Sequence, residues 1–122
     1  MGSEEITRGE AYNMITKAFG TLLPARYVQR DPRALLGRAE AVEVLLMSAN
    51  LQSPSGIIIR FPFSDVPSIS RIYPFIAHAF KLDIIMGYRD GTFRPFSTIT
   101  RAEMAKIIMK TIEKRYLLKT QR

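Results

Sequence analysis

One short motif occurs three times in this 122-residue chain and constrains its fold more than any other feature. The copies are residues 6–11 (ITRGEA), 36–41 (LGRAEA) and 99–104 (ITRAEM). After each copy, apolar residues recur at helical spacing. This pattern predicts three amphipathic helices, over about residues 7–19, 37–50 and 100–115.

Three similar apolar helix faces in so small a chain favour packing around a shared axis. Ile15, Leu45 and Ile108 each lie seven residues after the arginine of their motif, and we expect them near that axis. The predicted fold is therefore mainly α. It is a small helical domain with a pseudo-threefold bundle of motif helices and short turn or extended connectors.

Two of the motifs have the form of a helix capping box. Thr7 with Glu10, and Thr100 with Glu103, have the spacing at which each side chain satisfies a backbone N–H of the other residue. In the second copy Gly37 replaces the threonine before Glu40, so that cap should be weaker by up to ~1 kcal/mol. We interpret the glutamates as structural residues at helix starts and not as catalytic acids.

The motif arginines Arg8, Arg38 and Arg101 are not explained by capping. A cation in the first turn of a helix faces the positive end of the helix dipole, which costs stability. Three copies of an unfavourable choice indicate that the arginines serve either a partner or a buried pairing.

The segment before the third motif has its own pattern. It predicts a helix over about 70–82, with Pro74 in the first turn, followed by a tight turn at Asp90-Gly91 in which Gly91 has a positive φ. Tyr88 and Phe93 flank this turn. They either present aromatic faces at the rim of the helix cluster or plug its core.

Composition excludes several classes of function. Cysteine is absent, so disulfides, thiolate zinc sites and cysteine nucleophiles are excluded. The one histidine, His78, lies in an apolar helical pattern, and we interpret it as a partly exposed helix residue. No nucleophile, base and orienting group can be assembled, so we expect no enzyme activity, cofactor or metal. The apolar run 56–59 is too short for membrane insertion.

The chain is strongly basic. Its 18 Lys and Arg against 11 Asp and Glu give a net charge of +7 and indicate an acidic partner. Nucleic acid, anionic polysaccharide and anionic lipid headgroups would all satisfy this charge. The basic residues are scattered, however, and no motif for groove insertion or base stacking supports nucleic acid.

Three motifs in order resemble the S-layer homology (SLH) repeat: residues 63–67 (FSDVP), 87–95 (GYRDGTFRP) and 99–103 (ITRAE). The resemblance implies one complete repeat over 61–114. Residues 6–19 look like the closing helix of another repeat, and 21–50 look like a degenerate one. Together they would form a single SLH-like domain over 4–118.

Membership would imply a noncatalytic cell-wall anchoring module. SLH domains hold exported proteins at the bacterial cell surface by binding anionic, often pyruvylated, secondary cell-wall polysaccharide in grooves between prongs. The resemblance implies that Arg101 grips the anion in the best-preserved groove, with Arg38 and Arg8 as weaker counterparts. The expected helpers are the turn residues Tyr88, Arg89, Asp90, Gly91, Thr92 and Arg94. The export signal would lie outside this chain.

Departures from the family pattern leave an alternative open. Arg71 stands where the family often has Trp, Asp83 where it has Gly, and Phe96 where it often has Asn. The first two motif arginines are only 30 residues apart, so at least one groove should be missing or reshaped. The alternative is an SLH-derived protein-interaction or assembly module that has lost glycan binding. An exposed apolar patch at 57–59 or 117–118 would favour it.

Overall fold

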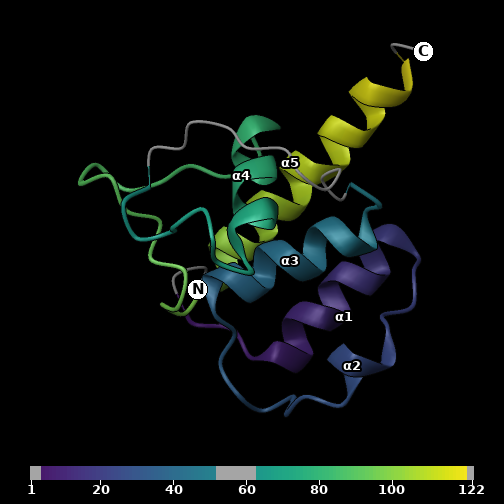
Figure 1. Cartoon of the computed structure of the whole chain (residues 1–122). Coiled ribbons are helices and arrows are strands. Elements are labelled where there is room, and N and C mark those ends of the chain that lie inside the picture. Colours follow the sequence, from purple (N-terminus) through teal and green to yellow (C-terminus); the bar gives the residue numbers. More distant parts are fainter. Residues whose placement is uncertain (1–3, 52–62, 121–122) are drawn as a thin grey trace.

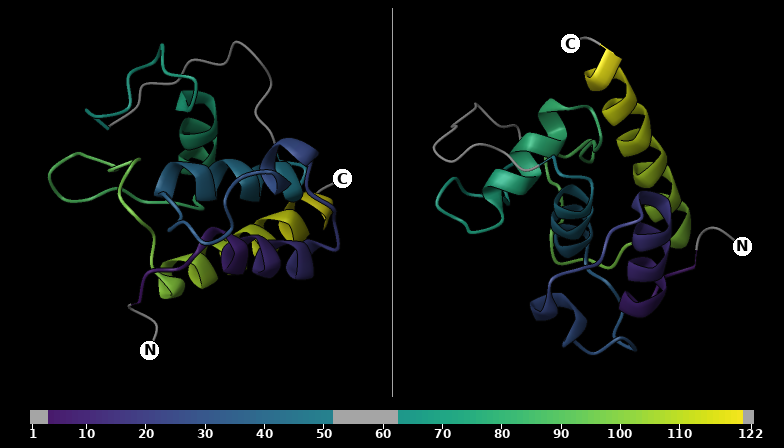
Figure 2. Two further views of the ribbon diagram at one scale, coloured as in Figure 1. Left: turned by 90° about the horizontal axis from the view of Figure 1, so that it is seen from below. Right: turned by 90° about the vertical axis from the view of Figure 1, so that its right-hand side faces the viewer.

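The computed structural model describes residues 4–51 and 63–120, and in that part of the chain it is mainly helical, as predicted (Figure 1). The helices are α1 (Arg8–Phe19), α2 (Ala25–Val28), α3 (Arg38–Ser48), α4 (Tyr73–Lys81) and α5 (Arg101–Thr120). The helices α1, α3 and α5 start at the three motifs. Helix α5 is longer than predicted, and its C-terminal end projects beyond the other helices (Figures 1 and 2).

The three motif helices pack on one another, since α1, α3 and α5 are in contact in every pairing. Ile15 and Leu45 are fully buried and Ile108 is 7% exposed, so the predicted axis residues are confirmed. Helix α4 packs on α3 alone among the motif helices. The connector between α1 and α3, residues 20–37, contains only the four-residue α2 and has no counterpart of α4.

A closed ring of three backbone hydrogen bonds joins the segments that lead into the motif helices. Leu36 N–H donates to Ile6 C=O (3.0 Å), Ile6 N–H to Ile99 C=O (3.3 Å), and Ile99 N–H to Leu36 C=O (2.9 Å). All three side chains are at most 2% exposed. This burial explains why each motif has an apolar residue two positions before its arginine.

The helix starts follow the predicted capping. The Thr7–Glu10 box is complete, and Thr100 Oγ1 accepts from Glu103 N–H at 3.1 Å. Gly37 gives α3 no side-chain cap. Instead, the backbone N–H of Arg38 donates to Ser97 C=O at 2.8 Å. The corresponding N–H groups of Arg8 and Arg101 donate to Ala34 C=O and Glu4 C=O at 2.7 Å each, so all three helix starts are held by a neighbouring segment, and the second lacks only the side-chain cap.

Helix α4 begins three residues later than the predicted 70–82 and ends one residue earlier. Its start is delayed because residues 70–73 form a tight turn, in which Ser70 Oγ accepts from Ile72 N–H (3.3 Å) and Ser70 C=O accepts from Tyr73 N–H (3.1 Å). Asp83 ends the segment at φ 64°, in the left-handed region that Asp tolerates better than most residues. His78 is half-buried on α4, and burial together with nearby Lys81 lowers its pKa.

Gly91 has φ 83°, which confirms the predicted turn. We expect Gly91→Ala to lower the free energy of unfolding by ~1 kcal/mol or more, measured by urea denaturation. Helix propensity alone predicts that Gly9→Ala, inside α1, is neutral or helpful. In the structure, however, a Cβ at residue 9 would lie 3.1 Å from both Cβ and O of Pro32. We therefore expect the helix-propensity gain at Gly9 to be offset, and a stabilised Gly9→Ala variant would contradict this packing.

Candidate functional site

The three motif arginines form a second closed ring, this time of side-chain ion pairs. Arg8 donates to Glu40 from Nε (2.7 Å) and Nη2 (3.0 Å). Arg38 pairs with Glu103, and Arg101 Nη2 donates to Glu10 at 2.7 Å. Each arginine thus reaches the motif glutamate of the next helix. Of the two explanations left open by the sequence, the structure shows the pairing.

The ring also affects the charge state of its carboxylates. The hydrogen bond from Arg101, followed by those from Thr7, lowers the pKa of Glu10 to about 2. Glu10 and Glu103 therefore have two roles, since each lies in the capping motif of its own helix and also binds the arginine of another, whereas Glu40 is seen only in the second role. The predicted capping role is seen for Glu10 and Glu103 but not for Glu40, whose helix start has no side-chain cap.

The three arginines differ in burial. The side chains of Arg8, Arg38 and Arg101 are 17%, 8% and 40% exposed. Arg38 is the most buried of the three, its Nε also donates to Phe93 C=O (3.0 Å), and its guanidinium lies over the rings of Phe93 and Tyr88. Arg38, on α3, therefore contacts both α5 and the turn over residues 88–94.

The side chains of the turn over residues 88–94 contact one another. Asp90 Oδ1 accepts from the N–H (3.1 Å) and Oγ1 (2.6 Å) of Thr92. The guanidinium of Arg94 lies 3.7 Å from the centre of the Tyr88 ring. Both expectations for the aromatics are met, because Phe93 is buried at 1% exposure whereas Tyr88 is 37% exposed. Arg89 is exposed at the tip.

This turn meets a different motif arginine from the one expected. Its aromatics contact Arg38 of the second motif, whereas Arg101 contacts Glu10 on α1. The reason is the cyclic arrangement of the bundle, in which the segment before α5 packs on α3. We therefore move the candidate anion site from Arg101 to Arg38.

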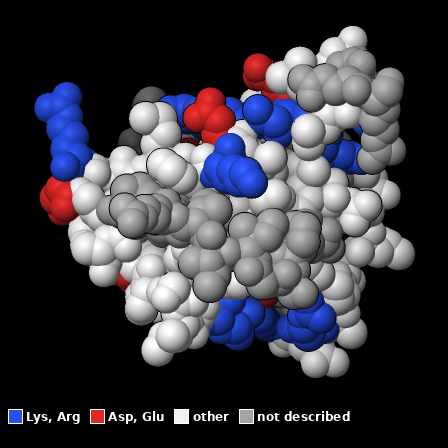
Figure 3. Space-filling model, turned by 45° about the horizontal axis from the view of Figure 1, so that its top comes forward, with Lys and Arg blue, Asp and Glu red and all other residues white. Residues whose placement is uncertain are grey.

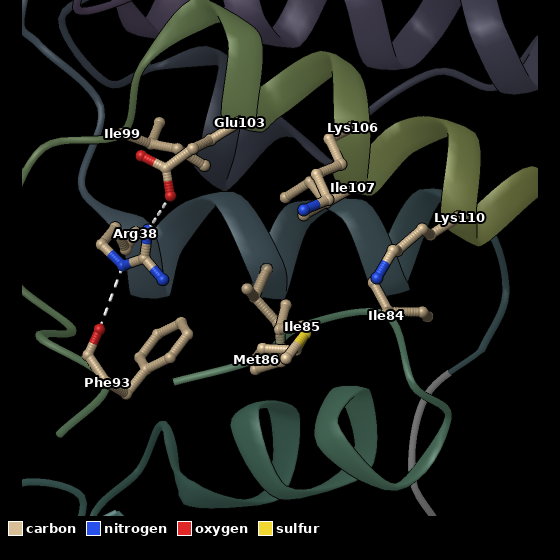
Figure 4. A pocket seen from close by; sticks show the side chains of 11 residues that line it. Arg38, Ile84, Ile85, Met86, Phe93, Ile99, Glu103, Lys106, Ile107 and Lys110 are labelled. Atoms are coloured by element: carbon tan, nitrogen blue, oxygen red, sulfur yellow. Dashed lines mark hydrogen bonds and ion pairs between the residues drawn. The ribbon is translucent and has the colours of Figure 1, made fainter. Parts of the chain in front are cut away.

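Beside Arg38 lies a cavity of about 110 Å³, which we call the Arg38 pocket (Figure 4). It is bounded by α3, α5 and the segment that follows α4. Its floor is apolar and includes Ile85, Phe93 and Ile107. The remaining lining residues are Arg38, Val42, Ile84, Met86, Ile99, Glu103, Lys106 and Lys110.

Lys106 and Lys110 project from α5 with their amino groups toward the Arg38 pocket (Figure 4). Within residues 4–51 and 63–120, neither lysine has a carboxylate partner. With Arg38 they make three cations around the single carboxylate of Glu103. The pocket therefore combines surplus positive charge with apolar walls, which suits a small anion that carries an apolar part.

A second hollow, the Arg71 groove, lies on another side of α3 and measures about 310 Å³. Arg71 and Arg30, which line it, pair with Glu43 (2.9 Å) and Glu40 (3.3 Å). Phe96, at its edge, is 84% exposed. The charges that line this groove are balanced, so it offers an anion less than the Arg38 pocket does.

Glu43 is the buried centre of the Arg71 groove, with a side chain only 4% exposed. Burial alone would raise its pKa, but hydrogen bonds from Arg71 and from Tyr27 Oη (2.6 Å) outweigh it and lower the pKa. Arg71 thus stands where an aromatic residue was expected and serves to pair a buried carboxylate.

Sequence reasoning missed Lys106, Lys110 and Glu43. The apolar positions of α5 indicate which face of the helix is buried. The two lysines lie beside that face and belong to no recognisable motif. One available signal was the spacing of the lysines, because like charges four residues apart in a helix repel each other. Figure 3 shows Lys and Arg in separate groups over one face of the molecule, so net charge alone did not locate the pocket.

Residues 62–105 match the S-layer homology domain. This chain carries an SLH repeat. The repeat includes the prong helix α4, the turn at 88–94 and the start of α5. Domains of this family are in general noncatalytic modules that anchor proteins to the cell wall.

A relative is consistent with the SLH assignment. "Cell surface glycoprotein 1" of Acetivibrio thermocellus is 30% identical to this chain over 83 residues, which is 68% of the chain. The chain spans only 4% of that relative's length. In the described part of the chain, no helix is both long and apolar enough to cross a membrane, and no group of three or more His, Cys, Asp or Glu is placed to hold a metal.

Proposed function

We propose that this SLH module anchors a longer protein to the bacterial cell wall by binding an anionic secondary cell-wall polysaccharide, without catalysis. The observation that carries the proposal is the Arg38 pocket, where three cations and one carboxylate stand over apolar walls. The net charge of +7 supports an acidic partner. The parent protein would be exported and lie at the cell surface.

The lining of the pocket bears on the part of the glycan that enters it. Cations beside apolar walls favour an acidic substituent that also carries an apolar group. A pyruvyl ketal, with one carboxylate and one methyl group, matches both the cations and the apolar walls.

We assign the roles within the site as follows. Lys106 and Lys110 bind the carboxylate, since neither has a carboxylate partner among the described residues. Arg38, held by Glu103 and Phe93 C=O, contributes fixed positive charge. Tyr88 and Arg94 support Arg38 from the turn. Arg8 and Arg101 maintain the ion-pair ring and shape the bundle.

An assembly function is the second candidate, favoured by apolar side chains on the projecting end of α5. Tyr116, Leu117 and Leu118 are 67%, 41% and 39% exposed. The other predicted apolar patch, residues 57–59, lies outside the described residues. Self-association measured by analytical ultracentrifugation, with wall binding absent, would support this function instead.

We expect the double variant Lys106→Gln/Lys110→Gln to bind isolated cell-wall sacculi at least tenfold more weakly, because a charge-assisted hydrogen bond is worth roughly 1.5–3 kcal/mol. Binding is measured by co-sedimentation, before and after acid extraction of the wall polysaccharide. The matched control is Lys17→Gln/Lys119→Gln, which removes two exposed lysines that line none of the pockets described here. Equal binding by the two double variants would contradict the site, as would binding that survives acid extraction.

A further inference from the structure

We infer that two copies of this chain pair through α5, with their two α5 helices side by side and antiparallel. The surface concerned, which we call the α5 seam, is a line of exposed apolar side chains along the helix: Ala102, Ala105, Met109, Ile112 and Tyr116. The inference is independent of the proposed function, because the pairing needs no glycan.

The spacing of the α5 seam is that of a coiled coil. Its residues follow one another at intervals of three, four, three and four, which are the a and d positions of a heptad. Met109, Ile112 and Tyr116 are 64%, 38% and 67% exposed. The buried side of α5 is separate and includes Met104 and Ile108. Helix α5 therefore has two apolar faces, and its own bundle buries one of them.

The charges beside the seam fit a second copy of the same helix in the antiparallel direction. Lys106 and Glu113 occupy the flanking position e of successive heptads, and Arg101 occupies the flanking position g. In an antiparallel pair with Met109 opposite Ile112 of the partner, e faces e. Lys106 of each copy then lies beside Glu113 of the other. A parallel pair would instead place Arg101 of each copy beside Lys106 of the other, so repulsion disfavours it.

The sizes of the seam residues also fit the antiparallel register. Tyr116 lies opposite Ala105 of the partner, so a large side chain meets a small one, while Met109 and Ile112 face each other at the centre. The seam is about 21 Å long at 1.5 Å per residue. The C-terminal end of α5 projects beyond the other helices, and in the pair it would lie along the start of the partner's α5 (Figures 1 and 2).

Pairing would place two Arg38 pockets in one assembly. A polymer with repeated acidic groups that reached both pockets would be held more tightly than by either alone. Lys106 lines the pocket and also flanks the seam. When Lys106 pairs with Glu113 of the partner, Arg38 and Lys110 still give the pocket more positive than negative charge beside Glu103.

Sedimentation equilibrium measures the pairing. The unaltered chain should form dimers in a concentration-dependent way. Met109→Lys/Ile112→Lys should raise the dissociation constant at least tenfold, because it brings four like charges together at the centre of the seam. The control Leu22→Lys/Val28→Lys adds the same charge at two apolar residues that are 97% and 64% exposed, and it should dimerise like the unaltered chain. Circular dichroism verifies that both variants stay helical.

The direction of the pairing is tested by disulfide cross-linking, since the chain has no cysteine of its own. On oxidation, an equal mixture of Met109→Cys and Ile112→Cys proteins should form mainly the mixed dimer, joined between positions 109 and 112. Each protein alone should cross-link at least fivefold less.

Three results would overturn the inference: an unaltered chain that stays monomeric, a dimer that is lost in the Leu22→Lys/Val28→Lys control, or efficient cross-linking of the Met109→Cys protein with itself, which indicates a parallel pair. A mixed dimer in only the proportion expected from random collision would overturn it as well. None of these measurements involves cell-wall material, so their failure leaves the proposed function standing.

Discussion

Replacing Arg38 by alanine is expected to lower the free energy of unfolding by about 3 kcal/mol, at the lower end of the range for breaking a buried ion pair. The Arg38 side chain is 8% exposed, whereas its partner Glu103 is 39% exposed and keeps some hydration. The change also leaves Phe93 C=O without its hydrogen bond and removes the guanidinium from two aromatic rings. Urea denaturation followed by circular dichroism measures the loss.

The other two motif arginines are the matched comparison. Arg8→Ala should cost less than Arg38→Ala, and Arg101→Ala should cost least, under ~1 kcal/mol, because its side chain is 40% exposed. Wall binding is measured on the same Arg101→Ala protein. Unchanged binding with a lowered melting temperature would identify Arg101 as a scaffold residue. Equal losses of stability for all three variants would show that the burial of each arginine does not determine how much its ion pair contributes.

Gly87→Ala is expected to cost about 2–3 kcal/mol, for a steric reason. A Cβ at residue 87 would lie 2.0 Å from Cε1 of Phe63. The Phe63 ring is 6% exposed and packs between Phe80 and Phe93, with ring centres 5.4 Å and 5.5 Å away. It has no open space into which to move, so the added methyl group must displace the core that supports the Arg38 pocket.

Gly37→Ala is the control for Gly87→Ala, since a Cβ there would meet only carbonyl oxygens at 3.7 Å and 3.8 Å. We expect its effect to stay within about 1 kcal/mol, the range for a change at a helix N-cap. The double variant Phe63→Leu/Gly87→Ala should recover part of the stability lost in Gly87→Ala. Similar losses for the two single glycine variants would rule out the clash with Phe63.

The repeated motif predicted much of the fold because the features that define its helices are set by residues close together in the sequence. Helix starts, capping boxes and the turn at Gly91 depend on residues a few positions apart, and the helical period marks the buried faces. The ion-pair ring depends on contacts 32, 65 and 91 residues apart in sequence. Arginine and glutamate recur two positions apart in every motif, yet nothing in a motif says which glutamate an arginine reaches.

The candidate site was only partly predictable for the same reason. The sequence indicated Arg38 and the turn residues, but it paired the turn with the nearest motif arginine in the chain, Arg101. The turn lies beside α3 because the segment before α5 packs on the start of that helix, and Phe93 of the turn lines the same pocket as Lys106 and Lys110 on α5. Arg71 was noted only as a departure from the family's usual Trp, whereas in the structure it pairs with Glu43, a residue without a distinctive local pattern.

The ring of backbone hydrogen bonds among Ile6, Leu36 and Ile99 has a consequence for how this module folds. In linear repeat proteins each unit contacts only its neighbours, so stability accumulates unit by unit. Here the first motif bonds the third as well as the second, and the closing contact spans nearly the whole chain. Bringing such distant segments together costs loop entropy before any contact is gained. The three motifs therefore form one cooperative folding unit, and the stability of the module cannot be divided among them.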